Sequence, residues 1–171
     1  MGAPGSGTTT IAKSICEQLN YPHFDSDSYL WLPTKEPFTV TRPEEEYLSL
    51  MSTDLNYHEQ WILSGHVSYG FADAYLPLYD LIVFVYVPAD IRIERLKKRE
   101  YERYGEEILP GGSKYDHSKE FLEWASSYDT SNGRRSLQGH EEWLKSVACP
   151  VLRITNNSLN DSINAVLDAM R

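Results

Sequence analysis

The sequence has few of the features that mark secreted, membrane-bound or nucleic-acid-binding proteins. Its two cysteines, Cys16 and Cys149, lie far apart and form no metal-binding pattern, so we interpret both as buried thiols in a reducing compartment. No apolar run reaches the length of a membrane span, and nothing resembles a signal peptide. Acidic residues outnumber basic ones, 25 to 16, and the net charge of −9 argues against a general nucleic-acid binder. We therefore expect a cytoplasmic protein with no membrane or nucleic-acid partner.

Internal repeats and low-complexity tracts are also missing. Apolar residues make up 41% of the chain and charged residues 24%, which is ordinary for a soluble globular protein. A length of 171 residues is enough for one domain with a substantial core. We therefore treat residues 1–171 as a single domain.

The opening stretch, residues 1–10, is rich in glycine. Gly2 and Gly7 fit the two glycines of a phosphate-binding loop, and Thr9 fits its closing Ser/Thr. Glycines suit such a loop because backbone amides must come close to phosphate oxygens. A helix that begins directly after the loop points its positive end at the same anion. Thr8 stands where the loop usually has its lysine, and a glycine-rich helix entry without a ligand is the alternative interpretation.

Apolar periodicity predicts strands that alternate with helices. The clearest strand is Asp80–Val87, whose continuous apolar run is typical of a strand buried on both faces of a parallel sheet. Shorter strands are predicted at 61–63 and 151–154, and helices at 8–19, 116–128 and 161–170, with others after Pro43 and Pro88. This alternation predicts a parallel sheet with helices on both faces.

Residues 2–10, read together with Asp25–Tyr29 and the arginine-rich helix after Pro88, resemble the P-loop kinase group that includes adenylate, shikimate and gluconate kinases. The resemblance implies an α/β fold, with a parallel sheet flanked by helices and a small helical lid at about residues 99–135. It implies ATP and Mg²⁺ as cofactors, and phosphoryl transfer to a small-molecule acceptor. The acceptor is left open among nucleotides, nucleosides and hydroxylated metabolites, and so is the choice between monomer and dimer.

One element of that resemblance is missing, because no apolar strand precedes Gly2. In this kinase group the first strand lies in the middle of the parallel sheet. Without it, two strand edges would face a gap, which is costly to leave unpaired. We therefore expect either that the protein begins upstream of Met1 or that the sheet closes in an unusual way.

The resemblance also implies a nucleotide site at the loop. Thr9 is expected to ligate Mg²⁺, and Asn156, in the loop after the last strand, is expected near adenine, although Asn-Asn-Ser is also a generic helix cap. The backbone amides expected around the phosphates belong to Gly2, Gly5, Ser6, Gly7 and Thr8.

Arginines gather on one face of the helix after Pro88. Arg92, Arg95, Arg99 and Arg103 are spaced three, four and four residues apart. By resemblance, this face belongs to the lid, and we expect Arg95 and Arg99 to neutralise the transferred phosphoryl group. After the lid, either Arg134 or Arg135 is expected to reach the same group. The alternative is a helix held by salt bridges along its own surface.

Two carboxylates after the second predicted strand mark the acceptor side. Asp27 is expected to hold Mg²⁺ through water or to accept the proton of an attacking hydroxyl, and Asp25 either contacts substrate or caps a turn. Gly65 and His66 follow a strand end, where parallel sheets place ligands. The further candidates for the acceptor pocket are Tyr29, Trp31 and Arg42, the last of which is as well explained as a solvated arginine before a helix.

The missing lysine keeps two other hypotheses open. Loss of a charge-assisted contact costs about 1.5–3 kcal/mol, so Thr8 would slow a kinase by roughly tenfold to a hundredfold unless other cations compensate. A nucleotide-binding sensor without catalysis is therefore the main alternative. An interaction protein that kept the fold and lost the ligand is the third.

Overall fold

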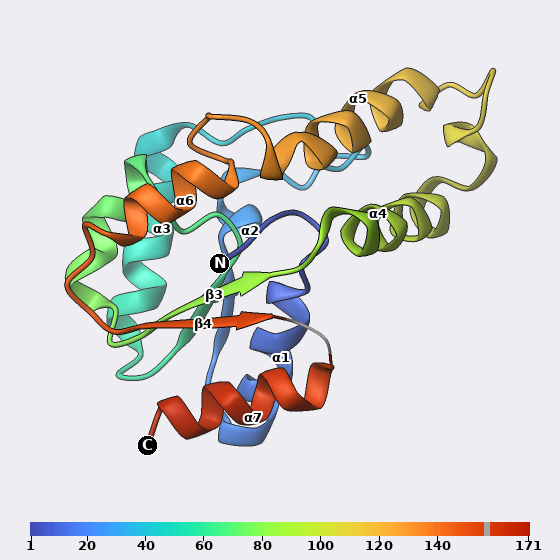
Figure 1. The fold of residues 1–171 in the computed structure, drawn as a ribbon. Coiled ribbons are helices and arrows are strands. Elements are labelled where there is room, and N and C mark those ends of the chain that lie inside the picture. Colours follow the sequence, from blue (N-terminus) through green and yellow to red (C-terminus); the bar gives the residue numbers. More distant parts are fainter. Residues whose placement is uncertain (156–157) are drawn as a thin grey trace.

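The structure is a computed structural model, and it describes residues 1–155 and 158–171 (Figure 1). The expected adenine contact at Asn156 therefore lies outside the described residues. The strands are β1 (His23–Asp25), β2 (Ile62–Ser64), β3 (Ile82–Tyr86) and β4 (Val151–Thr155). The α-helices are α1 (Thr8–Leu19), α2 (Ser26–Leu30), α3 (Glu44–Tyr57), α4 (Ala89–Tyr104), α5 (Tyr115–Ser126), α6 (Leu137–Leu144) and α7 (Leu159–Ala169). Short 3₁₀ segments cover η1 (Gly70–Leu78), η2 (Gly105–Ile108) and η3 (Ser127–Asp129).

The strands form two parallel pairs. β1 pairs with β2, so that His23 lies opposite Ile62, and β3 pairs with β4, so that Ile82 lies opposite Val151. Helices α1 and α7 lie on one side of the strands and α6 on the other (Figure 1). This arrangement confirms the expected α/β class, with parallel strands flanked by helices.

Alternate residues of β3 point to the two helical layers. Phe84 packs in a cluster with Trp143 of α6, whereas Val85 packs with Ile15 of α1 and Ile163 of α7. The β3 segment is therefore buried on both faces, as its continuous apolar run predicts. In the described residues, no helix is both long and apolar enough to serve as a membrane span.

The chain start takes the place where a first strand was expected. The backbone N–H of Val85 donates to the Met1 carbonyl at 2.8 Å, and the amino group of Met1 donates to the Val83 carbonyl at 2.7 Å. Gly2 forms a parallel bridge with Val85. Met1 and Gly2 thus make a single rung beside β3, and the described strands form two separate pairs instead of one sheet.

Helices α4 and α5 project together from the body as an arm (Figure 1). The arm is fixed at its base by Arg92, whose side chain is completely buried. Its guanidinium donates to the backbone carbonyls of Val87 at 2.8 Å, Ala125 at 3.0 Å and Pro4 at 3.4 Å. It also pairs with the Asp129 carboxylate at 2.5 Å. Arg92 is therefore a structural member of the arginine face and joins the phosphate-binding loop to both ends of the arm.

We expect Arg92→Met to lower the free energy of unfolding by about 3–5 kcal/mol, because it leaves Asp129 and several buried carbonyls without their partner. Lys97→Met on the exposed face of the same helix is the matched control, with an expected change within about 0.5 kcal/mol. Urea unfolding of both variants measures the difference. Equal effects would contradict the assigned role of Arg92.

Candidate functional site

The phosphate-binding loop has backbone conformations that favour glycine. Gly5 and Gly7 have φ angles of 80° and 91°, in the left-handed region. A Cβ on Gly2 would lie 2.4 Å from the Val85 carbonyl oxygen, and one on Gly5 would lie 2.7 Å from that of Arg92. The loop therefore lies directly against β3 and α4, and larger residues at these two positions would push it away.

The first turn of α1 carries nothing that would compete with an anion. Its N-cap residue, Gly7, provides no side-chain cap, and the first turn contains no acidic residue. The helix consequently presents uncapped N–H groups and the positive end of its dipole. This is the geometry that receives phosphate oxygens at helix N-termini.

A hydroxyl and a carboxylate meet beside that turn. The Thr9 hydroxyl donates to an Asp25 carboxylate oxygen at 3.3 Å, and Ser64 Oγ lies 3.5 Å from the same hydroxyl. His23 Nε2 hydrogen-bonds Ser64 Oγ at 2.9 Å from behind. Such oxygen ligands suit Mg²⁺, which usually takes one or two protein groups and completes its shell with phosphate and water. Within residues 1–155 and 158–171, no three His, Cys, Asp or Glu side chains form a metal cluster, in keeping with that mode of binding.

Asp27 lies where charges from several elements converge. The walls around its exposed carboxylate partly desolvate it, and this effect, followed by the charge of Asp25, raises its pKa. Arg135 and Arg99 act in the opposite direction and favour the ionised form. The Asp27 carboxylate is therefore more basic than a free aspartate, and it faces two guanidinium groups.

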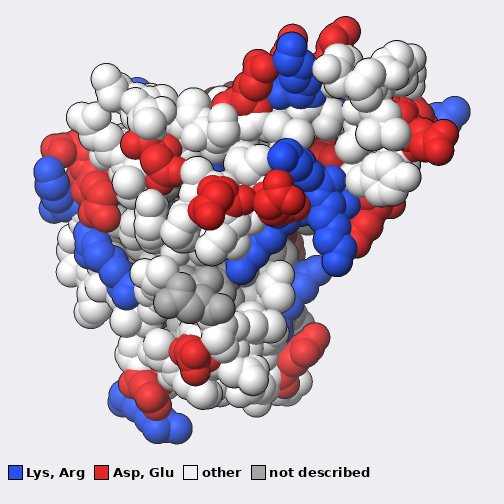
Figure 2. Space-filling view, turned by 45° about the vertical axis from the view of Figure 1, so that its right-hand side comes forward, with Lys and Arg blue, Asp and Glu red and all other residues white. Residues whose placement is uncertain are grey.

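The arginines on one face of α4 have different neighbours, depending on their position along the helix. Arg95 donates to the Gly5 carbonyl at 3.4 Å, and Arg99 lies in the electrostatic field of Asp27. Burial, followed by the neighbouring Arg103, lowers the pKa of Arg99. Figure 2 shows basic side chains gathered where the arm joins the body, with acidic side chains beside them. Arg95 therefore contacts the loop, Arg99 faces Asp27, and their expected action on a phosphoryl group stays a prediction.

The two arginines before α6 lie in different surroundings. The Arg134 guanidinium lies 5.5 Å from the centre of the Tyr69 ring. Arg135 interacts electrostatically with Asp27 and with His66. Of the pair that the sequence left open, Arg135 is thus the residue that the structure brings to the carboxylates.

Two residues predicted to contact the acceptor are engaged in the scaffold. The Tyr29 hydroxyl donates to Asp54 at 2.7 Å, and its ring is buried against α3. Arg42 donates to the Tyr29 carbonyl at 2.9 Å and pairs with Glu46 at 2.5 Å. These contacts correct the expectation for both: Tyr29 belongs to the core, and Arg42 holds the start of α3.

The other predicted acceptor residues surround Asp27. Trp31 forms a hydrogen bond with the Asp27 carboxylate, which stabilises the ionised form. Gly65 has a φ of 102°, and a Cβ there would lie 2.2 Å from Ser26 Oγ, so close packing against α2 requires glycine. The backbone N–H of His66 donates to the same Ser26 oxygen at 2.8 Å. Burial, followed by the charge of Arg135, lowers the pKa of His66 to about 4, so its imidazole is neutral at pH 7.

The loop between α2 and α3 reaches the arm. Glu36 pairs with Lys114 at 3.0 Å, and the Arg103 guanidinium lies 5.0 Å from the centre of the Phe38 ring. Both contacts join segments that are distant in the chain. They lie on the side of the site that carries Trp31, because Phe38 packs edge-on against that indole at 6.0 Å. The arm is thereby tied to both walls of the site.

The comparisons with known proteins agree with this geometry. The family described as AAA domain matches residues 1–122. The chain belongs to this P-loop family. It is also 45% identical over 170 residues to uncharacterized protein YqaC of Bacillus subtilis (strain 168), which covers 98% of this chain and 93% of that protein.

Solved kinases share the fold. The chain is similar to a shikimate kinase from Bacteroides thetaiotaomicron, with a TM-score of 0.52, 19% identity, and coverage of 99% of this chain and 94% of the other. It is similar to a gluconokinase from Sinorhizobium meliloti 1021, with a TM-score of 0.54, 16% identity, and coverage of 99% and 88%. The P-loop kinase-like fold is therefore established, and at these identities the likeness concerns the fold alone.

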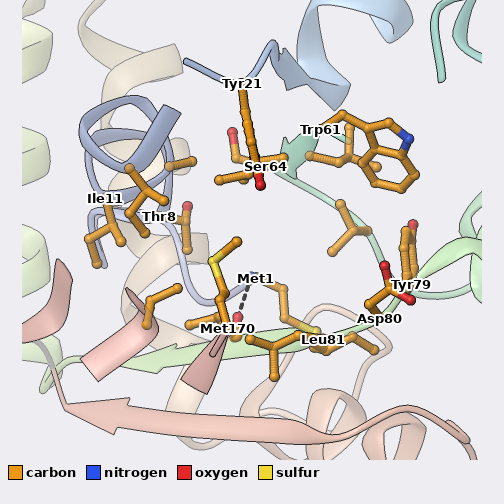
Figure 3. A pocket seen from close by; sticks show the side chains of 18 of the residues that line it. Met1, Thr8, Ile11, Tyr21, Trp61, Ser64, Tyr79, Asp80, Leu81 and Met170 are labelled. Atoms are coloured by element: carbon orange, nitrogen blue, oxygen red, sulfur yellow. Dashed lines mark hydrogen bonds between the residues drawn. The ribbon is translucent and has the colours of Figure 1, made fainter. Parts of the chain in front are cut away.

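Sequence reasoning missed the support behind the P-loop threonine. His23 and Ser64 were not singled out, although both stand on strands that end at the site. The available signal was strand alternation, because His23 and Asp25 are two residues apart and project from the same face. Thr8 differs from expectation too, since its side chain lines a cavity beside α1 that also has Ile11 and Ser64 in its wall (Figure 3).

The surroundings of Asp27 predict how its titration responds to substitution. We expect Arg135→Met to raise the pKa of the Asp27 carboxyl further, because the guanidinium stabilises the ionised form. Arg134→Met, which removes the neighbouring guanidinium that lies over Tyr69, should leave that pKa unchanged. NMR titration of the Asp27 carboxyl carbon measures both, and a larger response to Arg134→Met would reverse the assignment.

Proposed function

We propose that this protein is an ATP-dependent, Mg²⁺-requiring kinase that phosphorylates a small hydroxylated acceptor. The observation that carries the proposal is the arrangement around the uncapped start of α1. Thr9 and Asp25 meet there, and Asp27 faces Arg99 and Arg135. Phosphoryl transfer depends mainly on positioning and charge neutralisation, which this arrangement provides.

The residues present fit ATP and Mg²⁺. Backbone amides at the start of α1 would hold phosphate oxygens, and the oxygens of Thr9 and Asp25 would hold the metal ion. When bound, Mg²⁺ offsets the charge of the phosphates. The 3.3 Å contact favours Asp25 over Asp27 as the metal-side carboxylate, which leaves Asp27 the second of its two expected roles, that of proton acceptor.

Asp27 is then free to act on the acceptor. Its raised pKa makes it a better proton acceptor than a free aspartate, and the charges of Arg135 and Arg99 favour its ionised form. It would take the proton of an acceptor hydroxyl as that oxygen attacks the terminal phosphorus. Arg95, Arg99 and Arg135 would neutralise the charge on the transferred group.

The choice of a small acceptor rests on the fold and on the walls of the site. Trp31 and neutral His66 line the Asp27 side, so an acceptor would meet one aromatic ring and one uncharged hydrogen-bonding ring. The names of the two structurally similar enzymes, shikimate kinase and gluconokinase, favour a hydroxylated metabolite. Nucleosides and nucleotides remain in the acceptor panel.

The direct test is phosphoryl transfer from labelled ATP with Mg²⁺ to a panel of hydroxylated metabolites, nucleosides and nucleotides. We expect transfer to at least one acceptor, and a loss of at least about a hundredfold in Asp27→Asn because a proton acceptor is removed. Transfer should also fall as pH falls through the raised pKa of Asp27, since the protonated carboxyl cannot accept a proton. The Asp27→Asn variant should retain its affinity for ATP.

Two controls accompany this test. Asp168→Asn, in the exposed last turns of α7, should retain transfer. The Asp27→Asn variant should not unfold at a lower temperature than the unmodified protein. A raised carboxyl pKa means that folding disfavours the ionised form of Asp27, so removing its charge does not destabilise the fold. Intact ATP binding without transfer to any acceptor would contradict the kinase proposal.

A nucleotide-binding sensor is the second candidate, and Thr8 favours it because the loop lacks its usual cation. We expect Thr8→Lys to increase transfer by roughly tenfold to a hundredfold if a complete kinase site lacks only this charge. Thr10→Lys, on the exposed side of the same turn, should give no such gain. Steady-state transfer rates of both variants distinguish a kinase from a sensor. Tight ATP binding without turnover in either variant favours the sensor.

A further inference from the structure

The loop between α2 and α3 holds an aromatic residue in an unusual conformation. Trp31 forms an antiparallel bridge with Thr41, and residues 32–40 between them form what we call the 32–40 loop. Within it, Phe38 has a φ of 61°, in the left-handed region. Bulky residues rarely adopt this conformation, because Cβ comes too close to the following carbonyl oxygen. Strained residues of this kind gather at functional sites, so we asked what Phe38 contacts.

Polar contacts at its tip fix the 32–40 loop in place. The hydroxyls of Thr34 and Thr39 both donate to the Glu36 carbonyl, at 2.5 and 2.7 Å. The loop reaches the arm (Figure 1), where the Glu36 carboxylate pairs with Lys114, directly before α5, at 3.0 Å. A strained residue persists only where its surroundings over-determine the backbone, and these contacts on both sides of Phe38 do so.

The Phe38 ring lies between the acceptor side of the site and the arm. It packs edge-on against the Trp31 indole, with 6.0 Å between the ring centres and 90° between the ring planes. The Arg103 guanidinium of α4 lies 5.0 Å from the centre of the Phe38 ring. Both kinds of contact are directional, so together they define where the ring lies. Phe38 is 41% exposed, so burial of apolar surface does not account for its strained conformation.

Trp31 connects this ring to the carboxylate of Asp27. It lies directly after α2, where its backbone N–H donates to the Asp27 carbonyl at 3.0 Å and its side chain hydrogen-bonds the Asp27 carboxylate. The indole N–H is the single donor of a tryptophan side chain, so this second hydrogen bond depends on how the ring is turned. The indole is only partly buried, and the contact with Phe38 therefore contributes directly to its orientation.

We propose that Phe38 is a positioning residue for the proton acceptor of the proposed reaction, an inference that rests on the proposed function. It holds the Trp31 indole at the Asp27 carboxylate, and Arg103 holds Phe38 from the side of the arm. Phe38 acts on the carboxylate only through Trp31. The orientation of the proton acceptor is thereby tied to α4, the helix that also carries the arginines near the loop. A carboxylate that is not held in this way is a less well-oriented base.

The first test is NMR titration of the Asp27 carboxyl carbon in the full chain. Desolvation raises the pKa of Asp27 and the indole hydrogen bond opposes that rise, so we expect Phe38→Ala to raise this pKa further. Phe38→Tyr, which keeps the ring, should restore the pKa of the unmodified protein. Val40→Ala, at an exposed position of the same loop, should leave it unchanged. An unchanged pKa in Phe38→Ala would overturn the proposal.

A double-mutant cycle distinguishes positioning from a general loosening of the loop. In a Trp31→Phe background the indole N–H is absent, so Phe38→Ala should cause no further rise in the pKa of Asp27. The charged groups that also act on this carboxyl are present in every variant and belong to Asp25, Arg99 and Arg135. Equal rises in both backgrounds would show that Phe38 acts by another route, which would contradict the proposal.

Phe38→Gly keeps the test decisive if Phe38→Ala folds poorly. Glycine adopts a φ of 61° without strain, so this variant loses the ring while the backbone keeps its course. We expect the same rise in the pKa of Asp27, with an unfolding temperature no lower than that of Phe38→Ala. A rise in Phe38→Ala that is absent in Phe38→Gly would attribute the effect to backbone strain and would overturn the role of the ring.

The contribution of the arm is tested at Arg103. We expect Arg103→Met to raise the pKa of Asp27 in the unmodified background and to have no effect in the Phe38→Ala background. Lys98→Met, at an exposed position of the same helix, should have no effect in either. A rise that persists without the Phe38 ring would be a direct effect of the charge and would contradict the part assigned to Arg103.

Phosphoryl transfer provides the last readout. We expect Phe38→Ala to lower kcat by about tenfold and to change the KM for ATP by less than about twofold, and Phe38→Tyr to restore kcat. The pH at which transfer falls to half its maximum should move upward with the pKa of Asp27. An unchanged kcat despite a raised pKa would overturn the positioning role. Absence of transfer in the unmodified protein would contradict the proposed function alone, because the titrations test the link from Phe38 to Asp27 without it.

Discussion

The buried guanidinium of Arg92 holds together the parts of the protein whose relative position matters most. It hydrogen-bonds the loop at Pro4, the end of β3 at Val87 and the end of α5 at Ala125, and it pairs with Asp129. A side chain with five donors in a fixed plane is suited to join several carbonyls from different segments. The arm that carries Arg95 and Arg99 is consequently set at a defined position above the phosphate-binding loop.

The electrostatics of the site depend on that position. A loop that has Thr8 in place of lysine provides no side-chain cation of its own, and the guanidinium groups near it come from α4 and from the turn before α6. The charges of Arg135 and Arg99 favour the ionised form of Asp27 in a setting that raises its pKa. The guanidinium groups close to the loop and to Asp27 therefore come from segments distant in the chain.

Much of the fold was predictable because its causes are local. The helix predicted at 8–19 is α1, since Ile11 and Ile15 repeat at the helical period and Asn20 ends it in the left-handed conformation. The strand predicted around 80–87 is β3, because continuous apolar sequence of that length has one main structural solution.

The site was less predictable, because spacing along a helix fixes a shared face and leaves open what that face meets. Arg92 and Arg95 are three residues apart, yet the first is buried among carbonyls and the second lies at the loop. Tyr29 belongs to an Asp-rich turn and was expected in the acceptor pocket, but its hydroxyl donates to Asp54 of α3 and its ring packs in the core.

The sequence by itself determined the alternation of strands and helices, the glycine loop and the pair of carboxylates at the end of β1, because each is set by residues within a few positions of one another. Only the tertiary structure decided that Asp25 meets Thr9, that Arg135 and not Arg134 faces Asp27, and that Met1 forms a rung beside a free edge. Those relations join residues that are distant in the chain, and they depend on packing and on the burial of charge, which no local pattern records.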